Sequence, residues 1–103
     1  MEIENIRAAI ESQKIKVTDH ADEEAVDDRL TLTEVLQSVQ TGEIIEDYPT
    51  DKPYPSCLVF GKNEDDNPIH SVWAYNVSNG WAVLITVYRP DPTRWIEWKT
   101  RRK

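Results

Sequence analysis

The spacing of apolar side chains is helical in the first forty residues and alternating in the rest of the chain. Ile3, Ile6 and Ile10 recur at helical spacing and predict a helix over about Glu2–Ser12. Lys14–Thr18 then alternates apolar and polar side chains, which predicts a short strand. A helix followed by a strand therefore opens the chain.

Two more helices are expected before residue 42. Thr18 or Asp19 can cap the second by accepting the free backbone N–H groups of its first turn, and this helix runs to about Arg29. Thr31–Glu34 fits a capping box at the start of the third helix. An apolar stripe follows along it: Val35, Leu36 and Val39. Gly42 is the expected stop, because glycine tolerates the left-handed conformation at a helix end.

Beyond the third helix the pattern has the period of strands. Four segments fit: Glu43–Tyr48, Ser56–Gly61, Ile69–Tyr75 and Ala82–Tyr88. In the first, Ile44 and Tyr48 are expected on one face and Ile45 on the other. Short polar connections favour an antiparallel meander with helices on one face. The predicted fold is α+β in the order α-β-α-α-β-β-β-β, with N-terminal helices packed on a four- to five-stranded, mostly antiparallel sheet.

Composition fits one folded domain over residues 1–103, since 39% of the residues are hydrophobic and 30% charged. Cys57 is the one cysteine, which excludes an internal disulfide and a multi-cysteine zinc site; its alternating neighbours predict burial. No apolar run approaches the roughly 18 residues of a membrane span. The acidic N-terminus is unlike a signal peptide. We therefore expect a cytoplasmic protein without membrane contact.

Positive charge is concentrated at the end of the chain. Arg89–Lys103 holds six Lys/Arg against two acids, a net of +4, while the other 88 residues have a net of −11. The overall charge of −7 disfavours non-specific nucleic-acid binding, so an RNA site would depend on local cations. Trp95 and Trp98 are expected to fold this segment back on the sheet. Thr100–Lys103 is expected to be a frayed surface strip.

His20 is the first candidate for chemistry. It falls in the first turn of the second helix, where the helix dipole favours a neutral imidazole suited to a general base. The alternative is that His20 helps to cap its helix while Arg29 pairs with a nearby acid. His20, Glu24 and Asp27 also share one helical face and could present three metal ligands, although a solvated acidic face explains the same spacing. We expect no metal and no cofactor.

His70 and the strand end at Tyr88 form the second candidate. His70 lies in an apolar strand, where it is either a hydrogen-bonded core residue or part of a shallow cleft. Tyr88 and Arg89 could position or stabilise a phosphate, or could be ordinary aromatic packing with a surface cation. The three glycines are isolated, so no phosphate-cradling loop is present.

Several segments together resemble the bacterial domain-of-unknown-function 4258 family over about Lys14 to Arg101, which leaves residues 1–13 as an added helix. The matching segments are Val17–Ala21, Asp28–Leu30, Gly42–Pro49, Pro68–His70 and Ile85–Asp91 with Trp95. The resemblance implies a RelE/ParE-like toxin fold and a partner resembling a small zinc-finger antitoxin. It gives family positions to His20, Arg29, His70, Tyr88 and Arg89. The acidic stretch Asp22–Val26 stands where the family usually has a cation and a methionine, which weakens a phosphate role for that helix.

Two functions are compatible with these residues. The first is a toxin-like, metal-independent ribonuclease acting on RNA or at the ribosome. Its expected catalytic residues are His20, Arg29, His70 and Tyr88. Its expected substrate-binding residues are Arg89, Arg94 and Trp95. The alternative is a non-catalytic protein-binding module that uses Trp95 and Trp98 to hold an antitoxin-like protein or a second copy in a homodimer.

Overall fold

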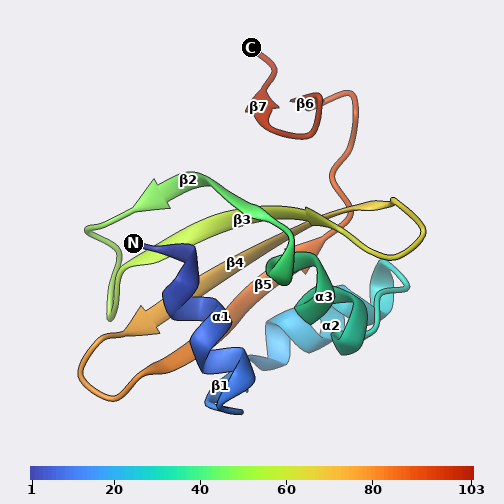
Figure 1. The fold of residues 1–103 in the computed structure, drawn as a ribbon. Coiled ribbons are helices and arrows are strands. Elements are labelled where there is room, and N and C mark those ends of the chain that lie inside the picture. Colours follow the sequence, from blue (N-terminus) through green and yellow to red (C-terminus); the bar gives the residue numbers. More distant parts are fainter.

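The structure, a computed structural model, describes residues 1–103. Three helices lie on one face of a five-stranded sheet (Figure 1): α1 (Ile3–Glu11), α2 (Asp19–Asp27) and α3 (Leu32–Gln40). The sheet contains β1 (Ile15–Val17), β2 (Glu43–Tyr48), β3 (Ser56–Lys62), β4 (Pro68–Asn76) and β5 (Trp81–Tyr88). The α+β class and the order of these eight elements are as the sequence predicted.

The sheet is mixed. Its strand order is β1-β5-β4-β3-β2, with β2 to β5 antiparallel as expected and β1 parallel to β5. The connection from β1 to β5 contains α2, α3 and β2 to β4, and a connection of this length allows parallel pairing. A further hairpin was not predicted: β6 (Trp95–Ile96) pairs with β7 (Thr100–Arg101) on the side of the sheet away from the helices (Figure 1).

The helix starts match the capping pattern. The Thr18 hydroxyl accepts a hydrogen bond from Ala21 N (3.0 Å), and Thr31 accepts one from Glu34 N (3.2 Å). The reciprocal half of the capping box is missing, since one carboxylate oxygen of Glu34 is buried without a partner. Each threonine thus satisfies one of the free N–H groups that begin its helix.

Gly42 has a different role from the one predicted. Helix α3 ends at Gln40 with Thr41 as its cap, and Gly42 has no left-handed backbone. A Cβ on Gly42 would lie 2.5 Å from the carbonyl oxygens of Ser38 and Phe60. Gly61 is still more crowded, because its Cβ would lie 1.8 Å from Ser38 O. These glycines allow the end of α3 to approach the sheet closely.

The core lies between the helices and the sheet. Its fully buried members include Ile6, Val35, Val39, Trp73 and Leu84. Cys57 is buried there as predicted, and its burial raises the pKa of the thiol to about 12. None of the three helices is long and apolar enough to cross a membrane.

A bulge in β2 changes which side chains share a face. Ile44 pairs with Val59 and packs against the core, but the register shifts before Glu46, which pairs with Leu58. The prediction that Ile44 and Tyr48 lie on one face is therefore wrong, because the extra residue reverses the alternation. Glu46 is brought to the sheet face that the helices leave uncovered.

Candidate functional site

His70 lies at the centre of a cluster on that uncovered face. It pairs across the sheet with Phe60 on β3 and Tyr88 on β5, and its side chain is fully buried. Trp95 of β6 covers it, with ring centroids 4.5 Å apart in an edge-to-face arrangement. The β6–β7 hairpin therefore packs on the sheet through the imidazole of His70. Burial also lowers the pKa of His70, because the charged form loses its hydration.

Two hydrogen bonds fix the state of the His70 ring. Nε2 lies 2.6 Å from the carbonyl oxygen of Trp98, and Nδ1 lies 3.2 Å from the hydroxyl of Tyr88. A carbonyl can only accept, so Nε2 carries the proton of the neutral ring. Nδ1 is then the acceptor, and Tyr88 donates to it. Burial raises the pKa of Tyr88, which keeps the phenol protonated at neutral pH.

Arg101 connects the hairpin to β2. Its Nε and Nη2 donate to the two carboxylate oxygens of Glu46 at 2.7 and 3.0 Å, and its guanidinium lies 4.7 Å from the Trp95 ring centroid. The hydrogen bonds from Arg101 lower the pKa of Glu46. Tyr48 also donates to Glu46, and its pKa is raised to about 12 by burial and by this bond.

Beside this cluster is an open cavity of about 350 Å³. It is lined by Tyr88, Arg89, Asp91, Arg94, Trp95 and Arg101. Three arginines face one aspartate, whose pKa is lowered by hydrogen bonds from the backbone and hydroxyl of Thr93. The Arg94 guanidinium has no hydrogen bond or ion pair within the chain. The cavity thus offers a free cation next to the Tyr88 phenol.

Arg89 is partly engaged elsewhere. Its Nε donates to Asp28 O (2.8 Å) and its Nη2 to Arg29 O (3.2 Å), while its backbone N–H donates to the Asp28 carboxylate. It therefore satisfies free carbonyls at the end of α2. The guanidinium still lines the cavity, so Arg89 both anchors the helix and contributes positive charge.

The structure does not bring His20 and Arg29 to this cavity. His20, at the start of α2, has a 63% exposed side chain whose Nε2 lies 3.0 Å from Glu24. Arg29 follows the other end of α2 in a left-handed conformation and is exposed. From His20 to the end of α2 the helix rises about 10 Å, and Arg29 lies beyond that end. Of the four candidate catalytic residues, the structure brings His70 and Tyr88 together and leaves His20 and Arg29 outside the cavity lining.

A family model described as Domain of unknown function (DUF4258) matches residues 17–89. The chain belongs to this family. No curated protein and no solved structure is significantly similar to the chain. The DUF4258 match includes His70, Tyr88 and Arg89, whereas Arg94, Trp95 and Arg101 come from the segment that follows it.

Three members of the cluster around His70 were not predicted as site residues. Glu46 and Tyr48 were read only as part of a strand, and Arg101 was assigned to a frayed strip, whereas Thr100–Arg101 forms β7 and pairs with β6. Opposite charges on distant segments were the only signal for the Glu46–Arg101 pair. Such a signal is weak in a chain with 19 acidic residues.

Two further groups of residues have their places in the structure. Trp95 is only 4% exposed and packs on His70, so little of its ring is accessible, whereas Trp98 is half-buried. The helical face of His20, Glu24 and Asp27 forms a His20–Glu24 contact, and no group of three such side chains is arranged to hold a metal.

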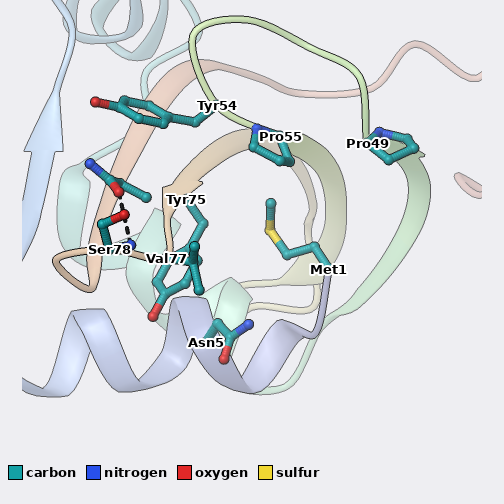
Figure 2. Close-up of a pocket in the computed structure, with 9 residues that line it drawn as sticks. Met1, Asn5, Pro49, Tyr54, Pro55, Tyr75, Val77 and Ser78 are labelled. Atoms are coloured by element: carbon teal, nitrogen blue, oxygen red, sulfur yellow. Dashed lines mark hydrogen bonds between the residues drawn. The ribbon is translucent and has the colours of Figure 1, made fainter.

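A second open cavity, of about 380 Å³, lies at the opposite ends of β3 and β4 from the His70 cluster (Figure 2). Figure 2 shows Tyr54, Pro55, Met1 and Tyr75 around the hollow, with Asn5 of α1 beside them. Its lining is mostly apolar and includes none of the predicted site residues. The arginine-lined cavity is therefore the better candidate for phosphate chemistry.

Proposed function

We propose that the protein binds the phosphate backbone of RNA in the arginine-lined cavity and cleaves the bound strand, as a toxin-like ribonuclease. The observation that carries this proposal is the Tyr88 hydroxyl, hydrogen-bonded to a buried His70 and adjoining a cavity with three arginines. Guanidinium groups bind phosphate oxygens by paired, charge-assisted hydrogen bonds. Arg94 is the principal contact because its guanidinium is uncommitted.

Cleavage would proceed through the Tyr88–His70 pair. The ribose 2′-oxygen attacks the adjacent phosphorus, and the bond to the 5′-oxygen of the next nucleotide breaks. The 2′-hydroxyl proton passes to Tyr88 Oη while the phenol proton passes to His70 Nδ1, and Trp98 O holds the ring through Nε2–H. The imidazolium then returns a proton through Tyr88 to the departing 5′-oxygen, so the products are a 2′,3′-cyclic phosphate and a 5′-hydroxyl. Burial opposes the resulting imidazolium, and the Glu46 carboxylate offsets part of this cost. The arginines stabilise the charge on the phosphorane.

The order of helices and strands supports a RelE/ParE-like toxin fold with α1 added at its start. Under this proposal the protein acts in the bacterial cytoplasm on free RNA or on the ribosome. An antitoxin-like protein would hold it inactive.

The test uses a fluorescein-labelled single-stranded RNA and a DNA of the same sequence. We expect both to bind and only the RNA to be cut, because DNA lacks the 2′-hydroxyl. Arg94→Ala should weaken binding about tenfold through loss of one charge-assisted contact. Tyr88→Phe should bind normally but cleave at least about 100-fold more slowly. Fluorescence anisotropy and gel electrophoresis provide the two measurements, repeated with messenger RNA on ribosomes.

Lys103→Ala is the matched control, since it removes the same charge outside the cavity lining. It should leave binding and cleavage within twofold, roughly the effect of a distant screened charge. Equal losses in Lys103→Ala and Arg94→Ala would refute the cavity as the binding site. Binding without cleavage on either free or ribosomal RNA would refute the nuclease and leave an RNA-binding protein.

A further inference from the structure

A groove between α2 and α3 gathers exposed apolar side chains. The large apolar residues exposed in this chain are Val17, Val26, Leu32, Tyr54, Val77 and Ile96. The first three all line one groove of about 240 Å³, and Val26 is 71% exposed. Buried Ala21, Val35 and Leu84 form its floor. Clustered exposed apolar side chains, unlike scattered ones, mark an interaction surface.

The rim of this groove is acidic. Asp19 and Asp22 line it directly. Helix α2 carries five acidic residues and no Lys or Arg: Asp19, Asp22, Glu23, Glu24 and Asp27. Because like charges repel across an interface, an acidic or neutral partner would gain little here, whereas a basic partner meets a complementary field.

We propose that this groove binds a short, basic, amphipathic helix of a partner protein. One or two leucine- or valine-sized side chains of the helix sit on Val17, Val26 and Leu32, and its Lys or Arg residues meet Asp19 and Asp22. This combination is the usual way in which an amphipathic helix fills a groove. The groove shares no residue with the arginine-lined cavity, so the inference is independent of the RNA proposal.

The probe is a synthetic helix of about 14 residues, near the minimum length for a helix alone in water. It carries leucine at positions i, i+4 and i+7 and arginine or lysine on its flanks. Two control peptides replace the leucines by glutamine or the basic residues by glutamate. Titration into the ¹⁵N-labelled full chain should shift the amides of groove residues, and only the first peptide should do so.

Two variants locate the contact. Val26→Gln should weaken binding of the probe about tenfold through loss of buried apolar area. Asp22→Lys should weaken it at least about fivefold through reversed charge at the rim. Val77→Gln and Asp65→Lys are the matched controls, since both alter exposed residues outside the groove. These controls should change binding by less than about twofold.

Three results would overturn the inference. The first is no binding of the basic peptide. The second is an equal effect of the control variants, which would show attraction to net charge alone. The third is a concentration-dependent dimer, seen by light scattering, that Val26→Gln dissociates. In that case a second copy of this chain, and not a basic partner, occupies the groove.

Discussion

His70 connects packing, protonation and candidate chemistry through a single ring. Its Nε2–H is committed to the Trp98 carbonyl and its Nδ1 to the Tyr88 hydroxyl, while Phe60 and Trp95 surround it. No polar atom of the ring is left for solvent, and burial favours the neutral form. His70 thus acts on anything in the cavity only through Tyr88.

Protonation of His70 should destabilise the fold. Its folded-state pKa is lowered, so below the ordinary histidine value of about 6.5 the unfolded chain binds a proton that the folded chain excludes. The free energy of unfolding should therefore fall as the pH drops from about 6.5 to the folded pKa, by at most about 1.4 kcal/mol per pH unit. Urea unfolding at a series of pH values measures this change in the free energy of unfolding.

His70→Gln should flatten this dependence, and His20→Gln, which changes the exposed histidine, should retain it. The lowered pKa of Glu46 contributes separately, because that stabilisation is lost only below about pH 4.5, the ordinary glutamate range. If the free energy of unfolding of His70→Gln depends on pH as in the unchanged chain, another titrating group causes the pH dependence.

The positions of individual site residues could be predicted only where the alternation of apolar residues and the lengths of the turns determine how the strands pair. His70 and Tyr88 fall in long apolar strands whose pairing follows from short turns, and these two residues do meet. Glu46 could not be placed, because a bulge reverses its face. His20 could not be placed either, because a position in the first turn of a helix does not say which face of the sheet that helix covers.

The β6–β7 hairpin is a small element held by few contacts. Its strands have two residues each. It is attached to the sheet by Trp95 packing over His70, by the hydrogen bond between His70 and Trp98 O, and by the Arg101–Glu46 and Lys99–Glu43 pairs. A two-stranded hairpin of this size is not stable alone in water. The three helices and five sheet strands could be predicted because each is long enough for its apolar residues to repeat at a regular spacing. A strand of two residues has no such repeat.

Trp95→Ala should release the hairpin while the sheet remains folded. Loss of the indole removes the cover of His70, and we expect a destabilisation of about 3 kcal/mol, at the low end for a buried tryptophan. Trypsin should then cut faster after Arg94, Lys99 and Arg101. Mass spectrometry of the products and circular dichroism of the remaining sheet provide the measurements.

Ile96→Ala is the control within the same hairpin, because Ile96 is 45% exposed. It should leave trypsin sensitivity close to that of the unchanged chain. If both variants are cut at the same rate, the polar contacts of the hairpin, and not the indole, hold it to the sheet.

Charge is distributed so that a strongly acidic molecule has one cationic cavity. The chain has a net charge of −7, yet three arginines from the segment after β5 line one cavity of about 350 Å³. The acidic groove on α2 and α3 lies apart from it, with no residue in common. A polyanion would therefore be accepted at one place and repelled over most of the remaining surface.

RNA affinity should depend only moderately on salt. With two or three arginines contacting phosphates, the slope of log K against log salt should be about −2 for single-stranded RNA, since each contact adds about −0.7. Arg94→Ala should make the slope shallower by about 0.7. Anisotropy titrations at several salt concentrations test this. A slope steeper than about −5 would require many more cations than the cavity holds.

The position of β5 has a consequence for synthesis of the chain. β5 lies between β1 and β4 in the sheet, so residues 15–17 find their strand partner only in residues 82–84. A ribosome-bound chain that has not yet released β5 has an unpaired β4 edge, and its β1 has nowhere to pair. The unpaired N–H and C=O groups of such strand edges can form hydrogen bonds with strands of other chains, which leads to aggregation. The nascent chain is thus most exposed to aggregation until residues 81–88 have left the ribosome.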